Sequence, residues 1–345
     1  MRVLITGAEG YIGAVLGPFL IAEGHEVIGL DCGFYRSGLL YDDGKPHPAV
    51  IIKDIREVSE RDLVGYDAVV HLAELSNDPL GEHDPRTTFA INHRGSVALA
   101  QRCKAAGVRR FVYTSSCSVY GLGAEGLCDE TSATAPQTAY ARCKTLVEHD
   151  VGALADTRFT PVFLRNATAF GPSPRMRFDI VLNNLAGLAW TRGEIRMTSD
   201  GTPWRPLVHV EDICRAIGAA LTAPREAVHG HIFNVGDDRQ NYRVRDIAEI
   251  VARVFPGCRT SFGAPSGDNR SYRVSFAKIR QHLPDFACRW SAEDGARQLR
   301  KIFARIAMTE EVFADRAFTR LLQLKHLIAT RQIDADFFWR NSAAA

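Results

Sequence analysis

The chain opens with Val3-Leu4-Ile5-Thr6-Gly7-Ala8-Glu9-Gly10-Tyr11-Ile12-Gly13, an apolar run that stops at a glycine-rich turn. The first three of these residues are all apolar, which is typical of a strand buried on both faces. After the turn, apolar residues recur at helical spacing, at Ile12, Val15, Leu16 and Phe19. The stretch therefore predicts a strand, a tight turn and the start of a helix.

The three glycines of the turn are expected to have separate roles. Gly7 permits the tight turn, Gly10 lets the backbone approach a ligand closely, and Gly13 lets the helix pack near the strand. The first N–H groups of the helix could then bind a diphosphate. The spacing is one residue longer than the common dinucleotide-binding fingerprint, so its meaning depends on the residues after the turn.

Asp31 comes directly after the next predicted strand, residues 26–30. At this position a carboxylate would accept hydrogen bonds from the ribose hydroxyls of an adenosine. The alternative is an aspartate that only stabilises a turn. A carboxylate here would repel the extra phosphate of NADP, which favours NAD, although Arg36 is close enough in sequence to keep NADP open.

Length and composition indicate a globular protein that acts on small molecules. The chain has 345 residues, of which 46% are hydrophobic, which is enough for a sizeable core. Its formal charge is only +2, and acidic and basic residues are interleaved. No basic stripe argues for nucleic acid or a membrane surface.

The cysteines and the apolar runs bear on the cellular compartment. The sequence has no Cys-x-x-Cys pair and no cluster of Cys and His residues, so we expect no structural zinc or other metal site. A strand that begins at Val3 leaves no room for a signal peptide, and no apolar run approaches the ~20 residues that span a bilayer. We therefore expect a cytoplasmic protein with free thiols. The cysteines are Cys32, Cys103, Cys117, Cys128, Cys143, Cys214, Cys258 and Cys288.

Strands and helices continue to alternate along the chain. Residues 50–53 and 68–74 are predicted to be strands, which indicates a parallel, doubly wound sheet. Ligands gather at the carboxyl ends of the strands in such a sheet. Asp54 and the pair Leu72-Ala73 should therefore border a cofactor, unless Asp54 is only a helix cap.

A long helix, residues 89–106, and a strand, residues 110–114, lead to the hydroxyl-rich segment 115–121, which could contact a substrate or form a polar turn. After a loop, Tyr140 and Lys144 stand four residues apart, on one face of a predicted helix. A tyrosine with its ordinary pKa of ~10 is a poor base at neutral pH and needs a nearby cation. Lys144 could supply that charge.

These motifs occur together and in a fixed order. With this set the chain resembles the extended short-chain dehydrogenase/reductases, specifically the NAD-dependent sugar-nucleotide epimerase/dehydratase family. The resemblance covers residue 1 to about residue 299. It rests on Gly7-x-x-Gly10-x-x-Gly13, Asp31, Thr114-Ser115-Ser116-x-x-Val119-Tyr120-Gly121 and Tyr140-x-x-x-Lys144.

The resemblance implies catalytic roles for Ser116, Tyr140 and Lys144. Ser116 would hold the reacting sugar oxygen, Tyr140 would be the acid/base, and Lys144 would bind the nicotinamide ribose and lower the pKa of Tyr140. Asn92 matches a family asparagine that is partly structural. Together with the strand-end positions, the expected NAD-binding residues are Gly7, Gly10, Tyr11, Ile12, Gly13, Asp31, Asp54, Ile55, Leu72, Ala73, Asn92, Tyr140 and Lys144.

The second half resembles the family's substrate-binding domain. Asn183-Asn184 resembles a segment that contacts the nucleotide diphosphate, and Arg205 matches an arginine that pairs with the phosphates. Arg270 is a second candidate, because a guanidinium can bind two phosphate oxygens at once. The expected substrate-binding residues are Ser116, Cys117, Ser118, Thr168, Asn183, Asn184, Arg205 and Arg270.

The expected fold class is thus α/β, a Rossmann-like doubly wound parallel sheet with a smaller α/β substrate-binding domain and an extra C-terminal helix. Residues 1–170, with a return segment at 207–236, would bind NAD. Residues 171–206 and 237–345 would bind the sugar nucleotide. The C-terminal helix is predicted at residues 309–331 and would dock on the substrate domain or a partner subunit; residues 337–339, Phe-Phe-Trp, should be covered.

The sequence departs from the family pattern at two places. Thr168 replaces an asparagine that contacts phosphate in many relatives. Cys117 and Ser118 replace the acidic pair of the 4,6-dehydratases, and neither suits the acid/base work of eliminating water. Glu74 is an additional carboxylate near the expected sugar site, and the sequence leaves open whether it contacts substrate or faces solvent.

The favoured function is an NAD-dependent epimerase that acts on a nucleotide-diphosphate sugar through a transient keto group, most simply at C4. The alternatives are a nucleotide-sugar ketoreductase or dehydrogenase, a 4,6-dehydratase, and an NAD-binding redox sensor without catalysis. By analogy with relatives, helices 89–106 and 138–155 would pair two copies into a homodimer.

Overall fold

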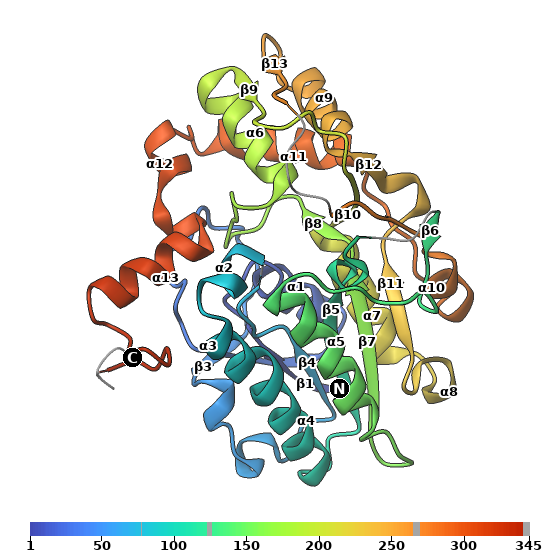
Figure 1. Cartoon of the computed structure of the whole chain (residues 1–345). Coiled ribbons are helices and arrows are strands. Elements are labelled where there is room, and N and C mark those ends of the chain that lie inside the picture. The colour runs from blue at the N-terminus through green and yellow to red at the C-terminus, as the bar shows by residue number, and fades with distance from the viewer. Residues whose placement is uncertain (77, 123–125, 265–269, 341–345) are drawn as a thin grey trace.

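The computed structural model describes residues 1–76, 78–122, 126–264 and 270–340. At its centre lies a seven-stranded parallel sheet in the order β11-β7-β5-β4-β1-β2-β3 (Figure 1). Its strands are β1 (Arg2–Thr6), β2 (Glu26–Asp31), β3 (Ala49–Ile52), β4 (Ala68–His71), β5 (Arg110–Ser116), β7 (Thr160–Asn166) and β11 (Ile232–Val235). This confirms the predicted Rossmann-like, doubly wound sheet.

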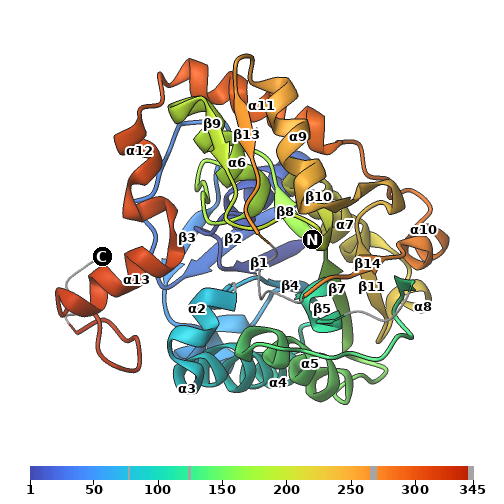
Figure 2. The same cartoon turned by 45° about the horizontal axis from the view of Figure 1, so that its top comes forward.

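Helices cover both faces of this sheet, as Figure 2 shows. On one face, α1 (Gly13–Ala22) packs against α7 (Val210–Thr222), and their apolar side chains share a core with β1 and β7. On the other face, α4 (Ser96–Ala105) and α5 (Ala139–Gly152) pack on β4 and β5. Because both faces are covered, the middle of β1 is apolar, and Val3, Leu4 and Ile5 are at most 1% exposed.

The second half of the chain builds a smaller layer above the carboxyl edge of the sheet. Its core lies among α6 (Val181–Arg192), α9 (Val244–Val254) and α11 (Ala292–Arg305). Three small sheets flank it: β8 (Thr168–Phe170), β10 (Trp204–His209) and β12 (Asn241–Arg243); β9 (Glu194–Arg196) and β13 (Arg259–Ser261); β6 (Leu127–Cys128) and β14 (Arg273–Val274). The chain returns to the central sheet through α7 and β11, and the division into two domains stays a prediction.

Short helical segments connect these elements. They are α2 (Asp78–His83), α3 (Pro85–Thr88), α8 (Arg225–Val228), α10 (Ala277–His282), η1 (Ile55–Glu57), η2 (Glu60–Leu63), η4 (Cys117–Tyr120) and η5 (Asp238–Gln240). The helix predicted over residues 89–106 starts with the π-helical segment η3 (Phe89–Gly95) and continues as α4.

The predicted single helix over residues 309–331 is wrong. The structure has α12 (Glu310–Ala314), a 3-10 turn η6 (Arg316–Phe318) and α13 (Arg320–Ala329). The break occurs because the Asp315 side chain accepts a hydrogen bond from the Ala317 backbone N–H, at 2.8 Å, which holds a turn where the helix would continue.

The C-terminal segment does not dock on the substrate half alone (Figures 1 and 2). Phe313 of α12 packs in the core of α6 and α9, whereas Leu324 and Leu327 of α13 belong to the core beneath β1 and β2. Phe337 is buried and Trp339 partly so, as predicted. The segment therefore bridges the two halves of the molecule. In the described residues, no helix combines the length and apolar character needed to cross a membrane.

Candidate active site

A cleft of about 540 Å³ lies between the carboxyl edge of the central sheet and the second layer. Both halves of the chain line it. It contains most of the predicted site residues: Gly7, Gly10, Tyr11, Ile12, Gly13, Asp31, Asp54, Ile55, Leu72, Ala73, Ser116, Ser118, Tyr140, Lys144, Thr168, Arg205 and Arg270. The fold thus brings together residues that are up to 263 positions apart, from Gly7 to Arg270.

The glycine turn forms one wall of the cleft. Gly7 has a φ of 76°, and a Cβ there would lie 2.8 Å from the backbone nitrogen of Ala73, so only glycine fits. A Cβ on Gly13 would collide with the backbone of Gly7 and Ala8. Helix α1 then begins without a side-chain cap, so its N-terminus faces the cleft as a site for an anion.

Asp31 stabilises its own turn and lines the cleft as well. Its carboxylate accepts hydrogen bonds from the backbone N–H groups of Gly33, at 2.8 Å, and Glu9, at 3.0 Å. Burial raises the pKa of this carboxyl. Arg36, which kept NADP open, is instead paired with Glu9 at 3.1 Å. The glycine turn, the uncapped N-terminus of α1 and the carboxylate of Asp31 together fit an NAD molecule.

Lys144 is a buried charged group of the cleft. Its side chain is only 4% exposed, and its ammonium donates to the carbonyl of Thr114. The ammonium lies 5.3 Å from the centre of the Tyr140 ring. As the spacing predicts, the phenol and the ammonium thus share one face of α5 and one cleft.

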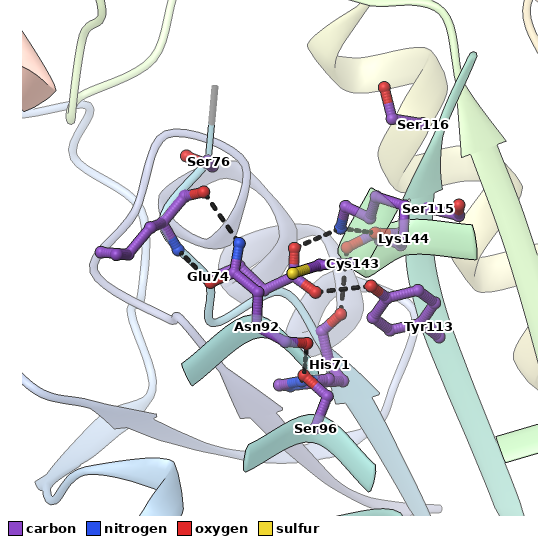
Figure 3. Close-up of polar contacts among 12 residues, drawn as sticks. His71, Glu74, Ser76, Asn92, Ser96, Tyr113, Ser115, Ser116, Cys143 and Lys144 are labelled. Atoms are coloured by element: carbon purple, nitrogen blue, oxygen red, sulfur yellow. Dashed lines mark hydrogen bonds and ion pairs between the residues drawn. The ribbon is translucent and has the colours of Figure 1, made fainter. Parts of the chain in front are cut away.

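Glu74 contacts the Lys144 ammonium, as Figure 3 shows. Its Oε2 lies 2.5 Å from Lys144 Nζ, and its Oε1 accepts a hydrogen bond of 2.5 Å from the Tyr113 hydroxyl. The side chain is 2% exposed, so the solvent-facing alternative for Glu74 is wrong. Sequence reasoning missed this contact because it depends on the pairing of β4 with β5.

The charges of this pair shape one another. Burial raises the pKa of the Glu74 carboxyl, and Lys144 and Tyr113 offset only part of that. Burial is the largest effect on the Lys144 ammonium and disfavours it, but Glu74, Tyr140 and Glu148 together outweigh burial and raise the pKa of Lys144. Lys144 is therefore a firmly charged ammonium that is shared between a carboxylate and a phenol.

Ser116 and Ser118 both line the cleft at the end of β5. The Ser116 hydroxyl oxygen accepts a hydrogen bond of 3.1 Å from the Ser118 N–H, which starts η4. The Ser118 hydroxyl and Asn166 Oδ1 are buried, and in the described part of the chain neither has a hydrogen-bond partner. Asn166 was not predicted; its position at the end of β7, beside Ser116, is the signal that could have found it.

Cys117 and Asn92 were predicted to contact substrate and cofactor, and the structure places both outside the cleft lining. Cys117 turns to the opposite side of η4, where its thiol donates to the carbonyl of Arg165. Asn92 is buried and its amide bonds both the N–H and the carbonyl of Leu75. It supports the turn after β4 through Leu75, which itself lines the cleft.

The pair Asn183-Asn184 is a further correction, because neither residue lines the cleft. Asn183 is fully buried and donates to the Tyr11 hydroxyl and the Arg177 carbonyl. Asn184 donates to the carbonyl of Phe178. Both amides hold the segment between β8 and α6 in place.

Two cleft arginines were not predicted, Arg177 and Arg320. Arg177 forms a bidentate ion pair with Asp179, at 2.8 and 3.0 Å. Arg320 comes from α13, and a signal for it exists in the sequence. It stands three residues after Ala317 and four before Leu324, so it is an arginine within an apolar stripe.

The sequence pattern of the NAD dependent epimerase/dehydratase family matches residues 3–236. The chain belongs to this family. Its cofactor is NAD, in agreement with the cradle and carboxylate described above.

Individual family members differ in their reactions. The UDP-glucose 4-epimerase of Mycolicibacterium smegmatis is 29% identical over 82% of this chain and 92% of that enzyme. The dTDP-glucose 4,6-dehydratase of Streptomyces niveus is 26% identical over 86% of this chain and 90% of that enzyme. The structure of MoeE5 with UDP-glucose and NAD superposes with a TM-score of 0.77 at 26% identity, and covers 89% of this chain and 100% of that one. The chain is thus an epimerase/dehydratase-type enzyme.

A buried ion pair fixes the helix that carries Tyr140 and Lys144. Glu148 of α5 pairs with Arg165 of β7 through two contacts, 2.7 and 2.9 Å, and also accepts a 2.5 Å hydrogen bond from the Ser115 hydroxyl. Both side chains are at most 5% exposed. The pair thus anchors the inner face of α5 against two strands.

Replacing Glu148 with alanine would leave the Arg165 guanidinium buried without a counter-charge. We expect the free energy of unfolding to fall by about 3–5 kcal/mol. The matched control is Glu293→Ala, which breaks the exposed Arg297–Glu293 pair and should cost less than about 1 kcal/mol. Urea unfolding of both variants measures the difference. Equal losses would show that the buried pair does not anchor α5.

Proposed function

We propose that this protein is an NAD-dependent nucleotide-sugar 4-epimerase in which Tyr140 is the acid/base. The observation that supports this most is the convergence of Tyr140, Lys144 and Ser116 on a cleft that the glycine turn and Asp31 also line. One cleft thereby offers a proton acceptor, a hydroxyl for the sugar and a place for a dinucleotide. The UDP-glucose 4-epimerases among the relatives agree with it.

The proposed chemistry divides between cofactor and chain. NAD, when bound, supplies the acceptor and then the donor of a hydride. Tyr140, as phenolate, removes the proton from the C4 hydroxyl of the sugar, while Lys144 stabilises the negative charge of that phenolate. The Ser116 hydroxyl holds the reacting oxygen. The keto sugar then turns over in the cleft, and Tyr140 returns the proton after the opposite face is reduced.

The carboxylates of the cleft argue against dehydration. Removal of water from a sugar needs a general acid and a general base beside the reacting carbons, roles that carboxyl groups can take. Among the described cleft residues, every carboxylate has a partner in the protein. Backbone N–H groups bond Asp31, and Arg56 pairs with Asp54. Lys144 pairs with Glu74, and Arg177 pairs with Asp179. Cys117 points away from the cleft, so the position of the dehydratase acid/base pair offers only Ser118.

A nucleotide-sugar ketoreductase or dehydrogenase is the second candidate, because it needs the same Tyr140, Lys144 and Ser116. It differs in exchanging its cofactor after each turnover. The phosphates of either substrate would meet Arg205 and Arg270, which line the cleft on the side of the second layer. The proposal also includes a cytoplasmic homodimer that pairs through α4 and α5.

The epimerase proposal predicts turnover without added cofactor. Purified protein is incubated with UDP-hexoses and dTDP-hexoses, and the products are followed by NMR. We expect an epimer to form with no net change in absorbance of reduced nicotinamide. Tyr140→Phe should lower the rate by about 10²–10⁴-fold, the usual contribution of an acid/base group.

Tyr66→Phe is the matched control, since Tyr66 lies outside the cleft lining, and its rate should be unchanged. Net reduction or oxidation of the nicotinamide without an epimer would instead favour the ketoreductase. Full activity of Tyr140→Phe would contradict both candidates.

Glu74 should set the pH dependence of this reaction. Its negative charge cancels part of the Lys144 charge that stabilises the phenolate, so Glu74→Gln removes an opposing charge. The acid limb of the pH–rate profile should then move to lower pH by about 1 unit. The other titratable or charged groups near Glu74, Lys144 and Tyr140 are unchanged in the variant; they include Tyr113, Cys143, Glu148, His71 and Arg177.

The shift has this direction because the base form of Tyr140 is the active one. With Glu74 present, the phenolate is less stable, so the loss of activity on acidification begins at a higher pH than in Glu74→Gln. Glu57→Gln, an exposed change outside the cleft, is the control and should leave the profile in place. A shift to higher pH in Glu74→Gln, or no shift, would show that Glu74 does not modulate Tyr140.

A further inference from the structure

The C-terminal segment holds the loop after β2. Gln323 of α13 donates to the carbonyl of Phe34 at 3.1 Å, and the Trp339 indole N–H donates to the carbonyl of Cys32 at 2.7 Å. The rings of Trp339 and Phe34 also pack, with centroids 5.7 Å apart. This loop continues directly from Asp31 and lines the same end of the cleft. Residues far beyond the family match of 3–236 therefore shape the cofactor side.

From this segment, Arg320 enters the cleft lining. The residue is only 2% exposed, and its guanidinium carbon lies 4.1 Å from the centre of the Tyr35 ring. Within the described residues, neither terminal nitrogen of Arg320 has a hydrogen-bond partner, and the buried Tyr35 hydroxyl has none either. Both terminal nitrogens of the guanidinium and the hydroxyl of the tyrosine stacked on it thus line the cleft without hydrogen-bond partners in the described protein.

The neighbours of Arg320 offset only part of the cost of burying its charge. Burial lowers its pKa to about 10, so it remains a cation at neutral pH. The nearby charges are Arg177 and Asp179, which pair with each other, and Asp31, which backbone N–H groups hold. Asp179 and Asp31 favour the Arg320 cation, but burial still lowers its pKa on balance. A buried, unpaired guanidinium is costly, and an anionic ligand would remove that cost.

The surroundings of Arg320 narrow the choice of anion. Asp31 would repel a phosphate on the adenosine ribose, so a 2′-phosphate does not fit this end of the cleft. Arg205 and Arg270 line the other side, where the phosphates of a sugar nucleotide are expected. The glycine turn before α1 bonds Asp31 through the Glu9 N–H, and Asp31 also acts on the charge of Arg320. The uncapped N-terminus of α1 that follows this turn also favours a diphosphate.

We propose that Arg320, together with the Tyr35 hydroxyl, binds the diphosphate of NAD, so that the C-terminal segment completes the cofactor site. The inference rests on the NAD cofactor of the proposed function but not on the reaction that the enzyme catalyses. Because α13 also packs on the core of the sheet, Arg320 is held in place. The cofactor can then leave only when the contact between Arg320 and the diphosphate breaks. Tight retention of the cofactor suits an enzyme that regenerates it in every cycle.

The test measures binding and not turnover. NAD content after purification and the NAD dissociation constant, from calorimetry on cofactor-stripped protein, are compared for wild type, Arg320→Gln and Arg320→Lys. Loss of hydrogen bonds to a charged group should weaken NAD and ADP-ribose by about 10- to 100-fold in Arg320→Gln. Arg320→Lys, which keeps the charge, should lose less. Arg316→Gln removes an exposed arginine from the same segment and should bind NAD as the wild type does.

Adenosine has no phosphate, so its binding, titrated by NMR, does not depend on a contact between Arg320 and the diphosphate. It therefore distinguishes loss of that contact from a general change in the structure of the cofactor site. Unchanged adenosine binding in Arg320→Gln, with weakened NAD and ADP-ribose, supports the inference, as does an unchanged thermal midpoint without cofactor. Equal weakening of adenosine and NAD, unchanged NAD affinity, or a greater loss for NADP than for NAD would overturn it. Absence of epimerisation, with the NAD result as expected, would remove only the proposed reaction.

Discussion

A single buried ammonium group organises this molecule. Lys144 leaves α5, crosses to the carboxyl edge of the sheet, and meets the Thr114 carbonyl of β5 and the Glu74 carboxylate just after β4. Inside the protein such charge-assisted contacts are strong, and each partner would be costly to bury alone. The contact therefore fixes α5 relative to two strands, and with it the position of Tyr140. The rest of the cleft is arranged around that position.

The charges of the cleft show a simple pattern. Its described carboxylates are engaged by the protein, whereas Arg320 has no protein acceptor. Such a cleft is suited to anionic ligands and poorly suited to exchanging protons through a carboxyl group. A dinucleotide and a sugar nucleotide, each with a diphosphate, match the first property. A tyrosine that acts beside a lysine matches the second.

Local patterns predicted the cofactor half well. The glycine turn, Asp31 and the alternation of strands and helices depend on short stretches, and Tyr140 and Lys144 depend only on the spacing within one helix. The errors arose where neighbours in sequence face different ways: Cys117 turns from the cleft between Ser116 and Ser118, and Asn183-Asn184 bond their own connection. Glu74 meets Lys144 through the pairing of strands, and Arg320 meets Tyr35, which lies 285 residues earlier in the chain. No local sequence pattern encodes either contact.

The fate of the hydrogen on sugar C4 tests the proposed reaction most directly. A substrate nucleotide sugar deuterated at C4 is converted, and the product is examined by NMR and mass spectrometry. A 4-epimerase whose cleft retains its cofactor returns the deuterium to C4 of the product, now on the opposite face. Deuterium found at C6, as in a dehydration, or on released reduced nicotinamide would contradict it.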